Sequence, residues 1–422
     1  MGVIKMDKKL IRDKYIDNLS TEFIPFWENA IDNEFGGVFT CYSNDGSQLV
    51  SEDKYTWSQG RFLWVTEALL TLRNQGVIKL NDKWETNFKK TYEFLKEYTM
   101  MENGHIAFAV KKDGKKIGDK MDTSIFADCF FVIGLSAYAK YYKDSNAFNI
   151  AYETFEIIKR RIQKGDFRSE PYPADKSYTS HSIPMILINV SEEIYLAAKV
   201  LNDSRKDLLK TDMDYFLNEI LKLTTDKRII EMKHENPSIE NLLTSHLNPG
   251  HTLESIWFMF HSMKETNHPD YNSINKRLEK IARIAIDKGW DEVNGGLLRF
   301  VHKDGGEPKG EQAGTTLETL IKDTWDMKLW WPHSEALYTT LLLFEITEDE
   351  DWLTTYKQME DYVFKTFPNK DKSIGEWIQI RNRQGNPEEK VVALPVKDPF
   401  HIIRNIVLII RLLGESNVTR KE

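Results

Sequence analysis

The residues able to do acid–base chemistry in this chain are its histidines and carboxylates, because the sequence lacks the motifs of other common catalytic sites. The 422 residues contain no GxGxxG or GxxxxGK[ST] phosphate-binding loop, no GxSxG nucleophile elbow and no HExxH helix. Only two cysteines, Cys41 and Cys129, occur, too few for a thiolate zinc site or a disulfide framework. Proton transfer by His, Glu or Asp is therefore the chemistry to look for.

The first candidate is His251, in the segment HLNPGHTLESIWF. The turn signal at 248–250 predicts the start of a helix, and Glu254 then lies one turn from His251 on the same face. A carboxylate in that place can orient an imidazole and fix its tautomer, as a general base requires. The alternative is that His251 only caps the helix. His246, before the turn, is expected to face solvent.

A second cluster, WDMKLWWPHSEAL, leads into another predicted helix. Tryptophan rings can cover the apolar face of a sugar, and His and Glu side chains can bond its hydroxyls. We expect Trp331, His333 and Glu335 to line such a pocket. The alternative is that Trp330 and Trp331 only staple the helix start, with Pro332 in the first turn.

Two further segments carry polar groups beside aromatic rings. In LPVKDPFHIIRNIV, His401 and Arg404 lie three residues apart on the last predicted helix, where an arginine is also often exposed. In YTWSQGRFLW, Gln59 and Arg61 stand between Trp57 and another tryptophan. An arginine can stabilise a developing enolate oxygen.

These clusters form one site only if the fold gathers helix starts at one end. The other histidines fall in predicted hairpins or loops, or after an apolar helix, and are expected to be structural or exposed. Because no set of histidines and carboxylates has metal-ligand spacing, we expect no metal.

The elements that must position these residues recur along the chain. Hairpin signals closed by Asp-Gly, Gly-Gly or Gly-Asn separate long stretches of helical periodicity, at residues 34–46, 102–114, 294–306 and 373–386. A weaker strand-like run, DKRIIEMKH, lies between them. The spacings are measured between one residue of each of these five segments, Gly37, Gly104, Ile230, Gly296 and Gly375, and are 67, 126, 66 and 79 residues. The long second spacing indicates a sixth unit near residue 165.

Each unit has room for two helices and a hairpin. Six such units predict an all-α fold, a six-fold (α/α)6 barrel with short hairpins in its loops. We expect one domain over 1–422, with the toroid core at about 20–410, since no linker composition interrupts the chain. An open helical solenoid is the alternative, although solenoids usually show a repeated consensus.

Composition excludes several classes of partner. Fifty-seven Lys and Arg against 65 Asp and Glu give a net charge of −8, which argues against a nucleic-acid binder. The first twenty residues lack the apolar stretch of a signal peptide, and no segment is long and apolar enough to span a bilayer. We therefore expect a cytoplasmic protein without a membrane partner.

The chain resembles the N-acylglucosamine 2-epimerase family through FGGVFTCYSNDG, WSQGR, SIFADCF, PMILINV, NPGHTLESIWF, KLWWPHSEAL and PFHIIR, which follow the family order from about residue 20 to 410. The resemblance implies an α6/α6 barrel with a cleft at one end and catalysis by two histidines that match His251 and His401. It implies further pocket positions at Arg61, Glu254, Glu335 and Arg404. A homodimer, and ATP as an activator and not a reactant, are also implied. PFHIIR departs from the family, which commonly has Pro between the His and the Arg.

Inversion at carbon 2 of an open-chain sugar needs removal of the proton next to the carbonyl, which gives an enediolate, and its return on the other face. We expect interconversion of N-acetylglucosamine and N-acetylmannosamine, with His251 and His401 as the two bases and Arg61 on the oxyanion. Glu254 and Glu335 would orient imidazoles or bind hydroxyls. No cofactor is needed for this chemistry.

Other functions stay open. A family isomerase or 2-epimerase could act on an unacetylated sugar such as mannose, glucose or cellobiose. A glycoside hydrolase of the same fold would need two carboxylates across a groove, for which Glu254 and Glu335 are available. A non-catalytic binding module would show an exposed apolar patch and would tolerate His401→Ala.

Overall fold

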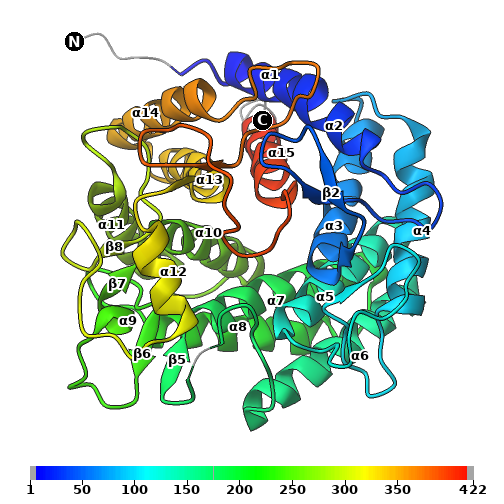
Figure 1. Cartoon of the computed structure of the whole chain (residues 1–422), viewed down its shortest axis with the longest axis horizontal. Coiled ribbons are helices and arrows are strands. Elements are labelled where there is room, and N and C mark those ends of the chain that lie inside the picture. The colour runs from blue at the N-terminus through cyan, green and yellow to red at the C-terminus, as the bar shows by residue number, and fades with distance from the viewer. Residues whose placement is uncertain (1–5, 174, 416–422) are drawn as a thin grey trace.

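Six helices form a closed inner ring in the computed structural model, which describes residues 6–173 and 175–415. Each inner helix contacts the next, and the last contacts the first, so that the ring closes (Figure 1). The six are α3 (Thr56–Asn74), α5 (Ile125–Tyr142), α7 (Ser182–Leu201), α10 (Pro249–Thr266), α13 (Trp330–Thr347) and α15 (Phe400–Glu415).

Six outer helices cover the inner ring, one on each inner helix. Five pack on the inner helix that precedes them in the chain, whereas α1, near the N-terminus, packs on α15. The outer helices are α4 (Asp82–Tyr98), α6 (Ser145–Lys164), α8 (Lys206–Lys222), α11 (Tyr271–Gly289), α14 (Glu350–Thr366) and α1 (Lys8–Asn18). The predicted (α/α)6 barrel is confirmed; its outer helix α1 lies before residue 20, and its inner helix α15 continues past residue 410.

The sequence pattern explains which helices lie inside. In α5 every residue from Ala127 to Ala139 is buried, and a helix that is apolar around most of its circumference is stable only inside a core. In α6 the buried apolar residues recur at helical spacing, as Phe148, Ala151, Phe155 and Ile158, which leaves a polar face for solvent. One helix of each kind per unit therefore produces two concentric layers.

Short strands fix the starts of four inner helices. β3 (Lys54–Tyr55), β5 (Tyr178–Ser180), β7 (His246–Leu247) and β9 (Lys328–Leu329) immediately precede α3, α7, α10 and α13. They pair antiparallel with β4 (Ala109–Val110), β6 (Met232–His234), β8 (Val301–His302) and β10 (Ile380–Arg381). This pairing holds the first turns of the helices at one end of the barrel.

The remaining elements lie around this frame. The predicted strand-like run contributes β6, and two helix pairs fill the long spacing, as the sequence indicates. Near residue 165 there is no hairpin strand, and Ser169 forms an isolated bridge with Ser124. The others are η1 (Leu19–Phe23), α2 (Ile24–Asn29), β1 (Cys41–Tyr42), β2 (Leu49–Ser51), α9 (Leu242–Ser245) and α12 (Thr316–Thr324).

Two buried lysines anchor equivalent Gly-Gly turns. Lys54 Nζ donates to Asp32 Oδ2 and to the Gly36 carbonyl, both at 2.6 Å. Lys328 Nζ donates to Asp291 Oδ2 at 3.2 Å and to the Gly296 carbonyl at 3.1 Å. Because a buried ammonium needs such partners, the two turns are stapled to the strands that begin α3 and α13.

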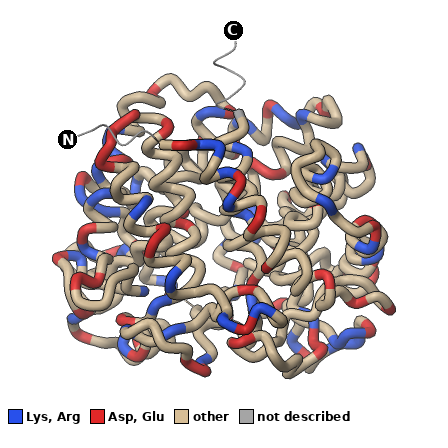
Figure 2. Tube along the Cα trace, turned by 90° about the horizontal axis from the view of Figure 1, so that it is seen from above, with Lys and Arg blue, Asp and Glu red and all other residues tan. Residues whose placement is uncertain are grey.

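None of the described helices is long and apolar enough to cross a membrane. Basic and acidic residues are interspersed over the part of the chain seen in Figure 2, and neither sign gathers on one region of that view.

Candidate functional site

A cavity of about 700 Å³ opens among the first turns of the inner helices, and all six contribute to its wall. Seven of the ten predicted site residues line it: Trp57, Arg61, His251, Glu254, Trp331, His401 and Arg404. The common position of these residues near the starts of α3, α10, α13 and α15 explains why segments far apart in sequence meet here.

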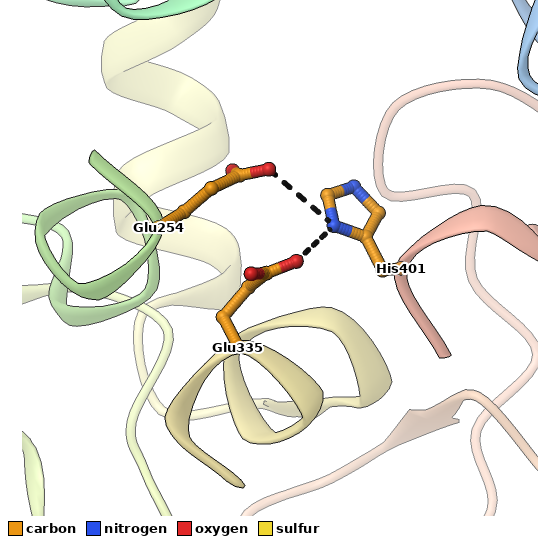
Figure 3. A group of neighbouring side chains, drawn as sticks. All are labelled: Glu254, Glu335 and His401. Carbon is orange, nitrogen blue, oxygen red and sulfur yellow. Dashed lines mark hydrogen bonds and ion pairs between the residues drawn. The ribbon is translucent and has the colours of Figure 1, made fainter. Parts of the chain in front are cut away.

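His401 is held by a carboxylate on one nitrogen and faces an arginine with the other. Its Nδ1 lies 2.7 Å from Glu335 Oε1 (Figure 3), and its Nε2 lies 3.3 Å from Arg61 Nη2. Burial alone would raise the pKa of Glu335, but Arg404, His401 and Trp257 lower it to about 2. Since an ionised carboxylate only accepts, Nδ1 carries the proton and Nε2 keeps a lone pair.

Arg404 joins the two predicted carboxylates. Its Nη2 donates to Glu254 Oε1 at 2.5 Å and to Glu335 Oε1 at 2.7 Å. Ligand atoms of Glu254, Glu335 and His401 lie within 4.8 Å of one another, a grouping that the sequence spacing did not indicate. The guanidinium already supplies the positive charge at these oxygens, so a metal cation there would be repelled by Arg404.

His251 is oriented by a residue that the sequence did not predict. Its Nδ1 lies 3.0 Å from Oε2 of Glu231, a buried residue next to β6. The prediction that Glu254 orients His251 is wrong. The Glu254 carboxylate instead bonds Arg404 and lies 3.7 Å from His401 Nδ1. Burial lowers the pKa of His251, but the Glu231 carboxylate outweighs this and raises it.

Glu231 in turn is held by two histidines. Although burial would raise its pKa, His251 and His181 hold the pKa of this carboxyl well below its usual range. His181 Nδ1 lies 3.7 Å from Glu231 Oε1, and the backbone N–H of His181 donates to the Glu231 carbonyl at 2.9 Å. Its Nε2 is 3.0 Å from Ser255 Oγ on α10. The pairing of β5 with β6 thus places the Glu231 side chain beneath His251.

Trp331 lies beside both imidazoles. Its ring centroid is 5.2 Å from that of His251 and 5.7 Å from that of His401. On another wall, Trp57 stacks on Phe130 at 5.2 Å, and the Arg61 guanidinium lies 4.2 Å from the Phe130 centroid. The cavity therefore offers two imidazoles beside an aromatic plane, with an arginine next to one of them.

Gln59 and His333 are not brought to the cavity. Gln59 pairs through both amide atoms with the backbone of Val38, at 2.9 Å each. His333 donates from Nδ1 to the Leu329 carbonyl at 2.6 Å and accepts at Nε2 from the Leu297 N–H at 2.8 Å. Both side chains are fully buried and tie hairpins to the starts of inner helices.

The expectation that His246 faces solvent is wrong. This residue is 3% exposed and lines the cavity, and its Nδ1 lies 2.7 Å from the Leu243 carbonyl. Its place in β7, paired with β8, turns the ring inward.

Gly250 is required for the place of Trp331. A Cβ atom added there would lie 2.5 Å from Cζ3 of the indole and 2.9 Å from Pro332 Cβ. We expect Gly250→Ala to displace Trp331 and to lower kcat/KM by about 10- to 100-fold, because displacements of about 1 Å are enough for such losses. Gly414→Ala, whose new Cβ meets only the flexible Arg12 side chain, serves as the control. Equal activity of both variants would show that the position of Trp331 is unimportant.

Comparisons with known proteins identify one family by sequence and several solved structures of the same fold. A profile described as N-acylglucosamine 2-epimerase (GlcNAc 2-epimerase) matches residues 37–404. The N-acylglucosamine 2-epimerase of Rattus norvegicus is 28% identical over 93% of this chain and 89% of its own. Among solved structures, the cellobiose 2-epimerase of Bacillus thermoamylovorans superposes with a TM-score of 0.77 at 18% identity, over 96% of this chain and 99% of that one. A D-mannose isomerase superposes with a TM-score of 0.73 at 15% identity, over 97% and 100%.

Proposed function

The chain belongs to the N-acylglucosamine 2-epimerase family and is an epimerase that acts on carbohydrates, and on that premise we propose that it interconverts N-acetylglucosamine and N-acetylmannosamine by a two-base mechanism. The observation that supports the proposal is the equivalent hydrogen bonding of two imidazoles. Each of His251 and His401 has its Nδ1 held by a carboxylate, and both rings flank Trp331. Two imidazoles of one cavity, one neutral and one protonated, are suited to remove a proton and to return a proton on the other face.

In this mechanism the open-chain sugar lies between the two rings. One imidazole takes the proton from carbon 2 through Nε2, and electrons move into the carbonyl to give an enediolate. The other imidazole, protonated, delivers its proton to the opposite face and inverts the carbon. Glu231 and Glu335 stabilise whichever imidazolium forms, because each accepts from an Nδ1–H.

Arg61 is suited to stabilise the enediolate oxygen. Its Nη2 is 3.3 Å from His401 Nε2, and its Nη1 bonds Asp398 Oδ1 at 3.2 Å, which fixes the guanidinium beside the reacting position. Burial lowers its pKa from the ordinary value, but an arginine stays charged at neutral pH. A fixed cation in a buried site stabilises developing negative charge without reorganisation.

The geometry does not support the hydrolase alternative. Glu254 and Glu335 both bond one nitrogen of Arg404, so neither is free to act across a groove. The pKa of Glu335, lowered to about 2, also excludes this residue as the protonated general acid that a hydrolase needs.

Proton NMR in deuterated water tests the proposal. N-acetylmannosamine should give N-acetylglucosamine that carries deuterium at carbon 2, and parallel tubes of mannose, glucose and cellobiose test the unacetylated alternatives. Exchange only with an unacetylated sugar would keep the mechanism and change the substrate. If no sugar exchanges, the epimerase assignment itself fails.

Three finer expectations stay predictions: a homodimer and activation by ATP, which the family resemblance implies, and a cytoplasmic location, which the sequence suggests. Sedimentation of the purified chain tests the first. Repeating the N-acetylmannosamine tube with ATP tests the second, and localisation of a tagged chain tests the third.

A further inference from the structure

Arg299 is a buried cation in the cavity wall without an acidic partner. It is 5% exposed and lines the cavity just before β8. Its Nη1 donates to Thr324 Oγ1 at 2.8 Å and its Nη2 to the Val392 carbonyl at 2.9 Å, while its buried Nε has no hydrogen-bond partner. Within the described ranges, no carboxylate oxygen lies within 4.0 Å of the guanidinium.

Such an arrangement leaves one donor of the guanidinium, the Nε–H, without a partner, and its removal from water is costly. Burial lowers the pKa of Arg299 to about 10, and the one opposing influence is the phenol of Tyr172. The Tyr172 hydroxyl donates to the same Val392 carbonyl at 2.9 Å, so this oxygen is shared. A buried guanidinium with a free N–H is satisfied when a ligand oxygen accepts from it.

Apolar side chains also lie near Arg299. Its guanidinium carbon lies 4.9 Å from the ring centroid of Phe300, which packs in a small core with Met232. Leu317 and Leu320 of α12 pack against that core and line the cavity. One donor beside an apolar wall matches a group with a carbonyl oxygen next to a methyl, which is the shape of an acetamido group.

Arg299 also lies on the His251 side of the cavity. It stands just before β8, which pairs with β7 at the start of the helix that carries His251, and the Phe300 ring next to it is 5.9 Å from that of His246, which shares the cavity wall. The acyl nitrogen of an N-acylhexosamine is attached to the carbon whose proton must move. A subsite beside a base is therefore where the acyl group of a bound substrate belongs.

We propose that Arg299 is the specificity-determining residue for the acyl group, and that its guanidinium donates to the carbonyl oxygen of the substituent on carbon 2. This rests on the proposed function for the identity of the ligand. It gives the site a means of distinguishing N-acylhexosamines from plain hexoses, since a site built around a hydrogen bond rejects a ligand that cannot make it.

Binding of reduced sugars tests this without any turnover. Isothermal titration should show that the wild type binds 2-acetamido-2-deoxymannitol more tightly than mannitol, neither of which can react. Arg299→Leu should weaken the acetamido alditol by about 10- to 100-fold and leave mannitol unchanged, as expected for loss of one charged hydrogen bond.

Arg381→Leu is the matched control. Arg381 is also buried and donates to backbone carbonyls, of Gly385 at 2.9 Å and of Phe367 at 3.3 Å, but it does not line the cavity. Its loss should lower the melting temperature and leave the preference intact. If Arg299→Leu does not fold, Arg299→Lys can be used instead. It keeps the positive charge but loses the planar set of guanidinium donors, and it should show a reduced preference for the acetamido alditol.

A wild type that binds both alditols equally, or an Arg299 variant that keeps the full preference, would overturn the proposal. Its failure is distinct from that of the proposed function. A chain that prefers the acetamido alditol but exchanges no deuterium at carbon 2 would keep the subsite and remove the epimerase assignment, and the reverse result would remove only the subsite.

Discussion

Replacing His401 by Asn should lower kcat/KM for N-acetylmannosamine by about 100- to 10,000-fold, the usual contribution of a positioned acid–base group. The Asn amide can still donate to Glu335, which now receives 2.7 Å hydrogen bonds from His401 and Arg404, so the carboxylate is not left unpaired. The lone pair at Nε2 is lost. The rate of conversion by NMR or a coupled assay measures the effect.

Isotope exchange makes the His401 prediction specific to two bases. In His401→Asn the remaining imidazole, His251, can still remove and return a proton on its own face. One epimer should therefore exchange its carbon 2 proton with deuterated water without inverting, while the other should not exchange. Equal loss of exchange from both epimers would instead indicate that His401 is needed for binding or ring opening.

His105→Asn is the matched control for this variant. His105 Nδ1 lies 2.6 Å from Asp122 Oδ2, a histidine–carboxylate pair like that of His401 with Glu335, but it lies in a hairpin and does not line the cavity. Its replacement should leave kcat/KM within about twofold. An activity of His401→Asn within tenfold of the wild type would exclude this residue as a base.

The fold follows from local signals. The unbroken apolar run of α5 and the one-sided stripe of α6 are readable in the sequence, and their alternation predicts two layers. Closure by α1 on α15 was not predicted, because the weakly apolar segment from Lys8 to Asn18 becomes an outer helix only through contact with a helix about 390 residues away.

The site was predicted where its residues stand at helix starts, as His251 and His401 do. Helix starts, however, also carry side chains that fasten hairpins, and neither spacing nor residue type distinguishes His333 from His401. Glu231 and Arg299 were missed because they lie beside two- and three-residue strands. Which way such a residue faces depends on pairing with a distant strand, and no local pattern encodes it.

Replacing Glu231 by Gln should lower kcat by about 100-fold, because the amide holds the His251 tautomer less firmly than a carboxylate and stabilises the imidazolium less. Glu231 Oε2 lies 3.0 Å from His251 Nδ1 and acts on the reaction only through that ring, so Glu231 is a positioning residue. A loss of activity alone does not separate this role from a structural one. The pH profile does.

The sign of the pH effect follows from the pKa of His251, which Glu231 raises above the ordinary value against the effect of burial. Without the carboxylate, burial prevails and the pKa falls. The limb of the kcat/KM profile that reports the ionisation of His251 should therefore move to lower pH. The same limb should move in both reaction directions, because the ratio of the two kcat/KM values equals the equilibrium constant, which does not depend on pH.

A shift of the same limb in profiles measured from both epimers is therefore a signature that a merely structural defect does not produce. Asp122→Asn, which removes the carboxylate from His105 outside the cavity, should leave both limbs in place. If Glu231→Gln lowers the plateau and moves neither limb, the carboxylate supports only the local packing of β6. In that case Glu231 does not determine the protonation of His251. Its hydrogen bond to His251 would then not have the same role as the hydrogen bond of Glu335 to His401.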